Sequence, residues 1–501
     1  MQKEGKRIAI RWIVLVTCCL AFGFFALLFG PTGISPLYSG TQFGHNDIDG
    51  NFFLYLGYAY LNGLKPYVDV FDHKGLFIFW IEALGGLMGN EGMYLVMSVF
   101  MSLNVFCYFL IFKEFGYNDK KASVSTLIIG AFLMLFTCMN GHHSGELLNP
   151  FFSLCVFLYV RAITRKSDCY FLLGSFVAGL SAGLAFSSRP SEAALPLGVV
   201  IFYFVYWLKN KRDLQLLWNA LIAIFGFMLP VSACLIEASC RGFLSEMISG
   251  FYLQSMVYVV HHASLERVMT RIFTIVITVV PLLTILLRRK KLDGPMNLFL
   301  FIVVLFIGIV QIAIARYANY WNSFIPVVLL AMIYNLMPKN MNKLALNISL
   351  SFMSTAVTVI ALTVSLMSFV PSESIMLFGC ECRGSLTCSL TTQRNLDTLI
   401  EEKDPNHKKE VYVLDANLGA MTYLGRISSC KYIGFSSWWS EDNPQINEYV
   451  MNFLQTEKPY WILGPSSFTE ESYFYNYVTN AYKQIGNDFH YTYFELNTPI
   501  A

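Results

Sequence analysis

A series of long apolar runs constrains this chain more than any other feature of its sequence. A helix needs about 20 apolar residues to cross a hydrocarbon core about 30 Å thick. Runs near that length cover residues 8–29, 93–112, 122–139, 147–163, 170–186, 193–208, 216–236, 268–287, 296–315, 321–336 and 344–370. Hydrophobic residues make up 55% of the chain and charged residues only 14%. We therefore predict a mainly α, polytopic transmembrane helical bundle of about eleven spans in a lipid bilayer.

Basic residues predict the orientation of the bundle. Lys and Arg favour cytoplasmic loops, and here they gather at the N-terminus and in every second loop. The clusters are Lys3, Lys6, Arg7 and Arg11; Lys113, Lys120 and Lys121; Arg161, Arg165 and Lys166; Lys209, Lys211 and Arg212; Arg288, Arg289, Lys290 and Lys291; and Lys339 and Lys343. We expect a multi-pass protein of the cytoplasmic (inner) membrane whose first loop and C-terminal part are extracytoplasmic. The net charge of +2 is too small to indicate a nucleic acid partner.

The chain divides into two predicted domains, residues 1–370 in the membrane and residues 371–501 outside it. The second part lacks long apolar runs. It shows short strand patterns at 411–414, 460–463 and 491–496 and helical patterns at 446–453 and 473–482. Because strands that alternate with helices are typical of an α/β unit, we expect a small extracytoplasmic α/β domain.

Polar residues concentrate in the first outer loop, at 43–83. The ionisable residues that we expect at the membrane face are Asp47, Asp49, Asp69, Asp72, His73 and Lys74. Ionisable groups gathered at a membrane face mark a functional site by default, although a solvated loop would carry the same residues. Apolar positions at 52–61 predict an amphipathic surface helix that starts near Asp49 and stops before Gly63. A second short apolar helix is expected at 76–88.

A second polar group lies in the turn at 141–150. His142 and Glu146 are four residues apart and would share one face of a helix. Together with His143, His261 and His262, they could bind a divalent metal such as Zn or Mn, because imidazole and carboxylate suit these ions. The alternative is that these histidines bond to backbone groups or water.

Two arginines oppose the charge trend of the outer loops. Arg189 lies in the sequence SSRP at 187–190, and Arg316 lies in ARYANY at 315–320. A guanidinium group matches phosphate oxygens bidentately, so both are candidate phosphate ligands; either could instead extend to the membrane interface. In such a site a carboxylate could take a proton from an acceptor hydroxyl, and a lysine could stabilise a departing phosphate.

Several of these motifs resemble one family. Asp49 with the following aromatic helix, GLKPYVD at 63–69 and FDHKG at 71–75 resemble the first outer loop of GT-C glycosyltransferases that use polyprenyl-phosphate sugars. The likeness is closest to the bacterial branch related to aminoarabinose transferases and protein mannosyltransferases. The sequence ELLNP at 146–150 is similar to that branch's second outer-loop motif, and Arg316-Tyr317 is similar to its late arginine-aromatic turn.

The resemblance implies a GT-C-like bundle that transfers a hexosyl or pentosyl group from a polyprenyl-phosphate donor to a cell-envelope glycan, lipid or protein. It makes Asp49 the general base or the carboxylate that positions the acceptor. It makes Lys74 a ligand of the donor phosphate, a role for which the charge argument above also makes Arg189 and Arg316 candidates. It makes Glu146 a residue that binds the acceptor or the sugar; further candidates for that role are Asp72, His73, His142 and Tyr317. No cofactor is implied beyond a possible divalent metal.

The sequence departs from the family at two positions. Gly75 stands where many members have a proline after the lysine. The first acidic motif is Asp49-Gly50 rather than an Asp-Glu pair, which leaves open whether Asp47 shares or takes the role of Asp49.

Two other functions compete with a transferase. A transporter or flippase of lipid-linked glycans usually holds its key charges near the bilayer midplane and is built from two related halves. Here the candidate charges lie on one predicted face and no halves are detectable, which favours the enzyme. A catalytically inactive relative whose tail binds a cell-wall partner is the third possibility.

Overall fold

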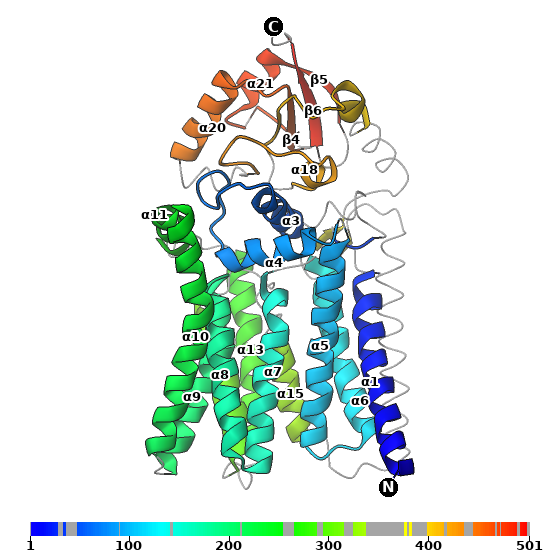
Figure 1. Ribbon diagram of the computed structural model, residues 1–501, viewed down its shortest axis with the longest axis vertical. Helices are drawn as coiled ribbons and strands as arrows, with labels where there is room; N and C mark the ends of the chain where they lie inside the picture. The colour runs from blue at the N-terminus through cyan, green and yellow to red at the C-terminus, as the bar shows by residue number, and fades with distance from the viewer. Residues whose placement is uncertain are drawn as a thin grey trace.

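The computed structural model describes most of the chain. The described residues are 2–28, 34–36, 48–89, 91–140, 144–210, 213–253, 265–287, 294–314, 324–336, 375–377, 380–382, 398–414, 418–434, 444–465, 468–470, 472–487 and 491–497. Two layers are visible in Figure 1, a bundle of long helices and a C-terminal region with a small sheet above one end of it. The N-terminus lies at the opposite end of the bundle.

The long helices confirm the predicted bundle. They are α1 (Gln2–Leu28), α5 (Gly92–Glu114), α6 (Asp119–Asn140), α7 (Ser144–Arg165), α8 (Asp168–Phe186), α9 (Ala194–Lys209), α10 (Asp213–Arg241), α13 (Leu265–Leu287), α14 (Pro295–Ile314) and α15 (Phe324–Leu336). Ten predicted spans therefore contain a helix, and the span predicted at 344–370 lies outside the described residues. Within the described part, seven helical segments are long and apolar enough to cross a membrane.

Small residues bring two of these helices into close contact. A Cβ atom on Gly179 of α8 would collide with the carbonyl oxygen of Ala223 on α10, and one on Gly226 of α10 would collide with that of Phe176 on α8. Between apolar helices in lipid, such close backbone approach supplies the packing energy that hydrophobic burial cannot. The α8–α10 pair is thus closely packed, and the turn that follows α8 belongs to the site described below.

Two short helices lie across one end of the bundle, beneath the C-terminal region (Figure 1). They are α3 (Ile48–Leu61) and α4 (Leu76–Gly86). As predicted, α3 ends just before Gly63, whose φ of +88° suits glycine. Its Phe53, Tyr55 and Leu56 are fully buried, so α3 is covered more completely than a helix lying on a membrane surface. The C-terminal region supplies that cover, and we call this end of the molecule the capped end.

The C-terminal region is an α/β unit built on a four-stranded sheet. Its elements are β3 (Val411–Val413), α18 (Gly419–Tyr423), α20 (Pro444–Thr456), β4 (Trp461–Pro465), α21 (Tyr475–Ala481), β5 (Tyr482–Asn487) and β6 (Tyr491–Leu496). The strand order is β3-β4-β6-β5, with β3 parallel to β4 and β6 antiparallel to both of its neighbours. A separate antiparallel pair is formed by β1 (Ile375–Leu377) and β2 (Cys380–Cys382).

The predicted α/β character of this region is confirmed. All three predicted strands and both predicted helices are present, within a few residues of their expected bounds. Of the elements named above, α18, β5 and the β1–β2 pair were not predicted. The polar and partly exposed residues of β5 carry no apolar alternation. The domain boundary expected between residues 370 and 371 falls outside the described residues and stays a prediction.

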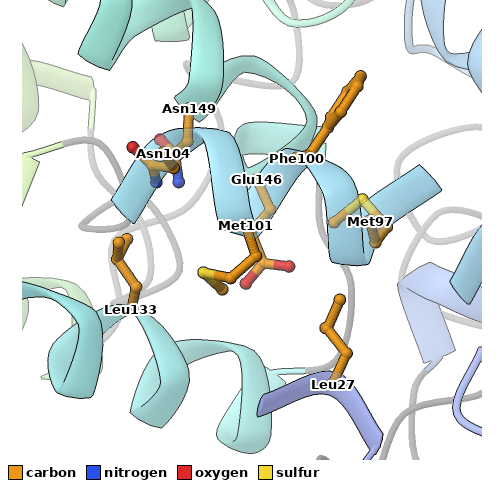
Figure 2. Close-up of a pocket in the computed structure, with 8 residues that line it drawn as sticks. All are labelled: Leu27, Met97, Phe100, Met101, Asn104, Leu133, Glu146 and Asn149. Carbon is orange, nitrogen blue, oxygen red and sulfur yellow. The ribbon is translucent and has the colours of Figure 1, made fainter. Parts of the chain in front are cut away.

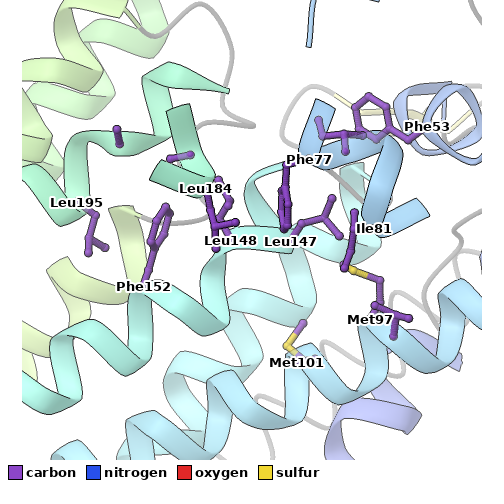
Figure 3. Packing of buried hydrophobic residues seen from close by; sticks show 14 of the residues in the cluster. Phe53, Phe77, Ile81, Met97, Met101, Leu147, Leu148, Phe152, Leu184 and Leu195 are labelled. Carbon is purple, nitrogen blue, oxygen red and sulfur yellow. The ribbon is translucent and has the colours of Figure 1, made fainter. Parts of the chain in front are cut away.

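Apolar side chains join the capped end to the bundle. Figure 3 shows this core, in which side chains of α4 face those of α5 and α7. The labelled residues are Phe53, Phe77, Ile81, Met97, Met101, Leu147, Leu148, Phe152, Leu184 and Leu195, all of them buried. Since α4 is fixed in this way, the loop at 70–75 that leads into it has a fixed position as well.

Hydrogen bonds join the C-terminal region to the same layer. Tyr58 Oη of α3 donates to the carbonyl oxygen of Gly425 at 2.8 Å, and the backbone N–H of Phe71 donates to the carbonyl oxygen of Lys431 at 2.9 Å. Because Phe71 immediately precedes Asp72, the C-terminal region holds the chain directly beside the polar loop.

Candidate functional site

Asp72, His73 and Lys74 form a compact group at the capped end, in the loop between α3 and α4. One carboxylate oxygen, Asp72 Oδ1, lies 3.0 Å from His73 Nδ1 and 3.8 Å from Lys74 Nζ. Asp72 and Lys74 are buried, and the His73 side chain keeps 18% of its surface exposed. Charged groups are costly to bury unless they are paired. The contact of Asp72 with the imidazole of His73 and the ammonium group of Lys74 therefore offsets part of the cost of burying the Asp72 and Lys74 charges.

The backbone of this loop is held from two sides. Tyr67, which has a φ of +66°, donates from its hydroxyl to the carbonyl oxygen of Lys74 at 2.8 Å. The N–H of Gly75 donates to the carbonyl oxygen of Ser188 at 2.8 Å, just after α8. A side chain at position 75 would collide with the backbone of Ser187. Gly75 is therefore the residue that this contact requires, and a proline there would lack the donated N–H.

The charges in this group alter one another's protonation. Burial alone would raise the pKa of the Asp72 carboxyl, but the positive charge of Lys74 and hydrogen bonds from His73 lower it below its usual value. Burial lowers the pKa of His73, as do the charges of Lys74 and Arg189, against the opposite effect of Asp72. At neutral pH the group thus holds a carboxylate and a neutral imidazole beside Lys74.

Lys74 connects the loop to α3. Its Nζ lies over the ring of Phe53, 4.7 Å from the ring centroid, in a cation–π contact. Asp49 is in the first turn of α3, four residues before Phe53, and residues four apart lie on the same face of a helix. Sequence reasoning placed Asp49 and Lys74 in one loop; the structure brings Lys74 to the helix face that carries Asp49.

Arg189 joins the same group from the turn after α8. It precedes the short helix η1 (Pro190–Ala193), and its Nη1 lies 3.4 Å from Ser144 Oγ at the start of α7. Glu192 of η1 is buried, and its carboxylate lies beside Gly145. Sequence reasoning missed Glu192, although an acidic residue two positions beyond Arg189-Pro190 and just before an apolar run was a signal of a buried partner.

A second missed carboxylate orders the two short helices. Glu237, near the end of α10, accepts hydrogen bonds from Tyr60 Oη of α3 at 2.7 Å and from Trp80 Nε1 of α4 at 2.6 Å. Its neighbour Arg241 donates to it at 3.0 Å and reaches the carbonyl oxygen of Leu64 at 3.1 Å. These contacts hold α3 and α4 at a fixed distance from each other. They therefore also help to position the loop between the two helices, which carries Asp72, His73 and Lys74.

Glu146 faces a different place. It is buried in the first turn of α7 and lines a cavity of about 10 Å³ together with Asn104 and Asn149 (Figure 2). The other lining residues are Leu27, Met97, Phe100, Met101 and Leu133. Such a volume suits a single water molecule with polar partners. This cavity shares no lining residue with the Asp72–His73–Lys74 group, and a role for Glu146 in acceptor or sugar binding stays a prediction.

Four predicted site residues fall outside the described part of the chain. They are Asp47, His142, Arg316 and Tyr317. Of the histidines and carboxylate expected to bind a metal, only Glu146 is described, and the described residues hold no group of three or more potential metal ligands. The prediction of a possible divalent metal is therefore not tested.

Comparison with solved structures relates this geometry to a known fold. The chain is similar to ArnT from Cupriavidus metallidurans, crystallised in the apo state, with a TM-score of 0.55 over 97% of this chain and 98% of that chain. ArnT is an aminoarabinose transferase of the GT-C class. This chain has a GT-C-like fold. The sequence identity is 11%, so the likeness concerns the fold alone.

Neither of the other comparisons adds to this result. No family model and no curated protein matches the sequence. The chemistry of the site therefore rests on its own residues: a buried lysine and an arginine that suit an anion, a carboxylate at a helix N-terminus, and a histidine bonded to a carboxylate.

Proposed function

We propose that this protein is a membrane glycosyltransferase that moves a sugar from a polyprenyl-phosphate donor to a hydroxyl-bearing acceptor of the cell envelope. The observation that carries the proposal is the position of Lys74, buried at the capped end of a GT-C-like bundle. Donors of this kind carry their phosphate at the membrane face, where an ammonium group can bind it as a point charge. The reaction is a single displacement at the anomeric carbon and needs no cytoplasmic nucleotide.

Lys74 and Arg189 bind the donor phosphate in this proposal. Both charges lower the pKa of His73, Lys74 more strongly than Arg189, so both act on the same part of the site. As the sugar–phosphate bond breaks, negative charge grows on the departing phosphate, and two fixed cations stabilise that charge in the transition state. Arg316, next to Tyr317, completes this set if the predicted loop at 315–320 reaches the capped end.

Asp49 serves the acceptor side. It lies one helical turn before Phe53 on α3, and Phe53 touches Lys74. A carboxylate there accepts a hydrogen bond from the acceptor hydroxyl and directs its oxygen toward the anomeric carbon. Asp47 would take this role if Asp49 does not. Asp72, His73, His142 and Glu146 remain the other candidates for contacts with the sugar or acceptor.

The capped end is extracytoplasmic in this proposal. The basic clusters of the sequence predict it, and the first loop and the C-terminal region lie at the same end of the bundle (Figure 1). The protein would then be in the cytoplasmic membrane, with residues 1–370 forming the catalytic part. Residues 371–501 would close over α3 and shape the approach of the acceptor.

A transfer assay tests the proposal. Membranes with the wild-type chain are supplied with a labelled pool of short-chain polyprenyl-phosphate sugars and with cell-envelope acceptors. We expect transfer by wild type and its loss in Asp49→Asn, with normal insertion of the variant. If Asp47→Asn rather than Asp49→Asn abolishes transfer, Asp47 has the acceptor role.

The same preparation separates the transferase from a transporter. Reconstituted vesicles that move the lipid-linked sugar across the bilayer without transferring it would contradict the proposal and favour a flippase. A chain that binds the lipid and neither moves nor transfers the sugar would identify an inactive relative.

A further inference from the structure

His73 and Asp72 form an oriented imidazole–carboxylate pair. His73 Nδ1 lies 3.0 Å from Asp72 Oδ1, and Asp72 is buried with only 3% of its surface exposed. A buried carboxylate is a hydrogen-bond acceptor, so the proton of the neutral ring resides on Nδ1. The lone pair is then on Nε2. This is the tautomer in which a histidine can take a proton from a substrate.

The pair sits where the proposed reaction occurs. The same oxygen, Asp72 Oδ1, lies 3.8 Å from Lys74 Nζ, the proposed ligand of the donor phosphate. The His73 side chain keeps 18% of its surface exposed while Asp72 behind it is covered. The imidazole therefore stands between a buried carboxylate and the surface of the site, next to the point where the phosphate would bind.

Asp49 is less suited to take the proton. It lies in the first turn of α3, where the backbone N–H groups and the helix dipole stabilise the charged form of a carboxylate. A charged carboxylate held there is suited to accept a hydrogen bond from the acceptor hydroxyl. A general base works best when its pKa lies near the working pH, and an imidazole meets this condition more closely than a carboxylate at a helix N-terminus.

We infer that His73 is the general base of the transfer, that Asp72 is the positioning residue behind it, and that Asp49 orients the acceptor without taking its proton. This inference rests on the proposed function. The acceptor oxygen forms a bond to the anomeric carbon as the bond from that carbon to the phosphate oxygen breaks. The hydroxyl proton passes to His73 Nε2, and the bonding pair of the broken bond leaves with the polyprenyl phosphate.

The charges around His73 agree with this role. The charged groups that act on it include Lys74 beside it, Asp72 behind it and Arg189 from the turn after α8. Burial and the two cations lower the pKa of His73, while Asp72 raises it. The ring is therefore neutral at pH 7 and able to accept a proton, and the imidazolium that forms is stabilised by Asp72.

The pH dependence of transfer tests the inference, measured as kcat/KM with the labelled donor pool. In wild type we expect kcat/KM to fall toward acid with a midpoint below the usual histidine value of 6.5. His73→Gln should lower kcat by roughly 100-fold or more and abolish this acidic limb, because general bases contribute about 10²–10⁴-fold. Binding of a short-chain polyprenyl monophosphate should stay within about 2-fold of wild type, since Lys74 is intact.

Asp72→Asn separates positioning from simple structural support. Without the carboxylate, the pKa of His73 loses the effect that raises it, so the acidic limb should move to lower pH rather than vanish. His407→Gln is the matched control, because His407 also pairs with a carboxylate, Glu401, at 3.1 Å, but lies exposed in the C-terminal region. Its pH profile should equal that of wild type.

Two results would overturn the inference in different ways. An active wild type whose acidic limb persists in His73→Gln would show that another group takes the proton, and the transferase would stand. A wild type that binds the polyprenyl monophosphate yet transfers no sugar would overturn the transferase, and the general base with it.

Discussion

The ammonium group of Lys74 lies 4.7 Å from the centroid of the Phe53 ring, so the loop before α4 and the middle of α3 meet through a cation and an aromatic face. The contact holds Lys74 in place without neutralising it, because an aromatic ring attracts a cation but carries no net charge. Asp72 Oδ1, at 3.8 Å from Lys74 Nζ, is its described ion-pair partner. A second anion, such as a phosphate, would find the lysine already oriented.

Replacement of Lys74 should weaken donor binding. Lys74→Met keeps the apolar contact with Phe53 and removes the charge. Since a hydrogen bond to a charged group contributes about 1.5–3 kcal/mol, we expect affinity for a short-chain polyprenyl monophosphate to fall roughly 10- to 100-fold. Lys65→Met is the control, because Lys65 is an exposed lysine of the same loop. Equal loss in both variants would mean that general surface charge, rather than Lys74, attracts the lipid.

Gly75→Ala should disrupt the loop. The added Cβ would collide with the carbonyl group of Ser187 and the backbone nitrogen of Ser188. These are backbone atoms, so no flexible side chain can move aside. We expect a lower thermal unfolding midpoint and loss of monophosphate binding, because Asp72, His73 and Lys74 shift together. Gly198→Ala on α9 is the control, since its Cβ would meet its nearest neighbour at an ordinary 3.4 Å. A Gly75→Ala variant that binds the monophosphate normally would show that the turn after α8 can shift to make room for the methyl group.

Sequence patterns predicted the elements of the fold but not the contacts between distant segments. The spans follow from run length alone, and the strands at 411–413 and 461–465 follow from short apolar stretches. The packing of the C-terminal region over α3 could not be predicted in this way, because it joins distant segments: Tyr58 bonds to Gly425, 367 positions away. Likewise, the sequence showed only that Gly75 differs from the proline of many family members. The structure gives the reason, since a side chain at this position would collide with the backbone of Ser187.

The candidate site shows the same division. Asp72, His73 and Lys74 are neighbours in sequence, so their grouping was predictable, and Arg189 was singled out because it opposes the charge trend. The role of Glu237 was not predictable. A glutamate near the end of a span is common at a membrane interface, and only the packing of α3 and α4 brings Tyr60 and Trp80 to its two oxygens.

Glu237→Gln should loosen the two short helices. The amide keeps one acceptor oxygen, but its NH₂ group would face either Arg241 Nη1 or the Trp80 N–H, and both of these groups only donate. A lost bond to a charged group and a partly buried donor without its acceptor together cost about 2 kcal/mol. We expect Glu237→Gln to have a lower thermal unfolding midpoint than wild type, measured in detergent by tryptophan fluorescence. Glu91→Gln, at an exposed position before α5, should unfold like wild type; equal midpoints in all three proteins would contradict the role of Glu237.

The C-terminal region contains a buried ion pair that should set its stability in acid. Asp404 Oδ2 accepts a hydrogen bond from Arg426 Nη1 at 2.6 Å, and its carboxylate also accepts the backbone N–H groups of Lys408 and Lys409 at 3.0 and 2.8 Å. Burial alone would raise the pKa of Asp404, but these bonds lower it below its usual value of 3.8. A carboxyl whose pKa is lower in the folded state stabilises that state fully above the unfolded pKa.

This stabilisation should therefore be present at neutral pH and lost as the pH falls below about 4 toward the lowered pKa of the folded protein. Hydrogen exchange of the segment 398–434 in the full-length chain, corrected for the intrinsic rate at each pH, should show opening over that range. Asp404→Asn removes the buried partner of Arg426 and leaves its charge with the half-exposed Glu401 alone. Breaking a buried ion pair costs up to about 3–5 kcal/mol, so the segment should already open at pH 7 and lose its acid dependence. Glu401→Gln is the matched control: Glu401 also pairs with Arg426, at 3.1 Å, but its side chain is 38% exposed, and exposed pairs contribute about 0–1 kcal/mol. Equal opening in the two variants at pH 7 would mean that the charge of Arg426, rather than its bond to Asp404, governs the stability of this region.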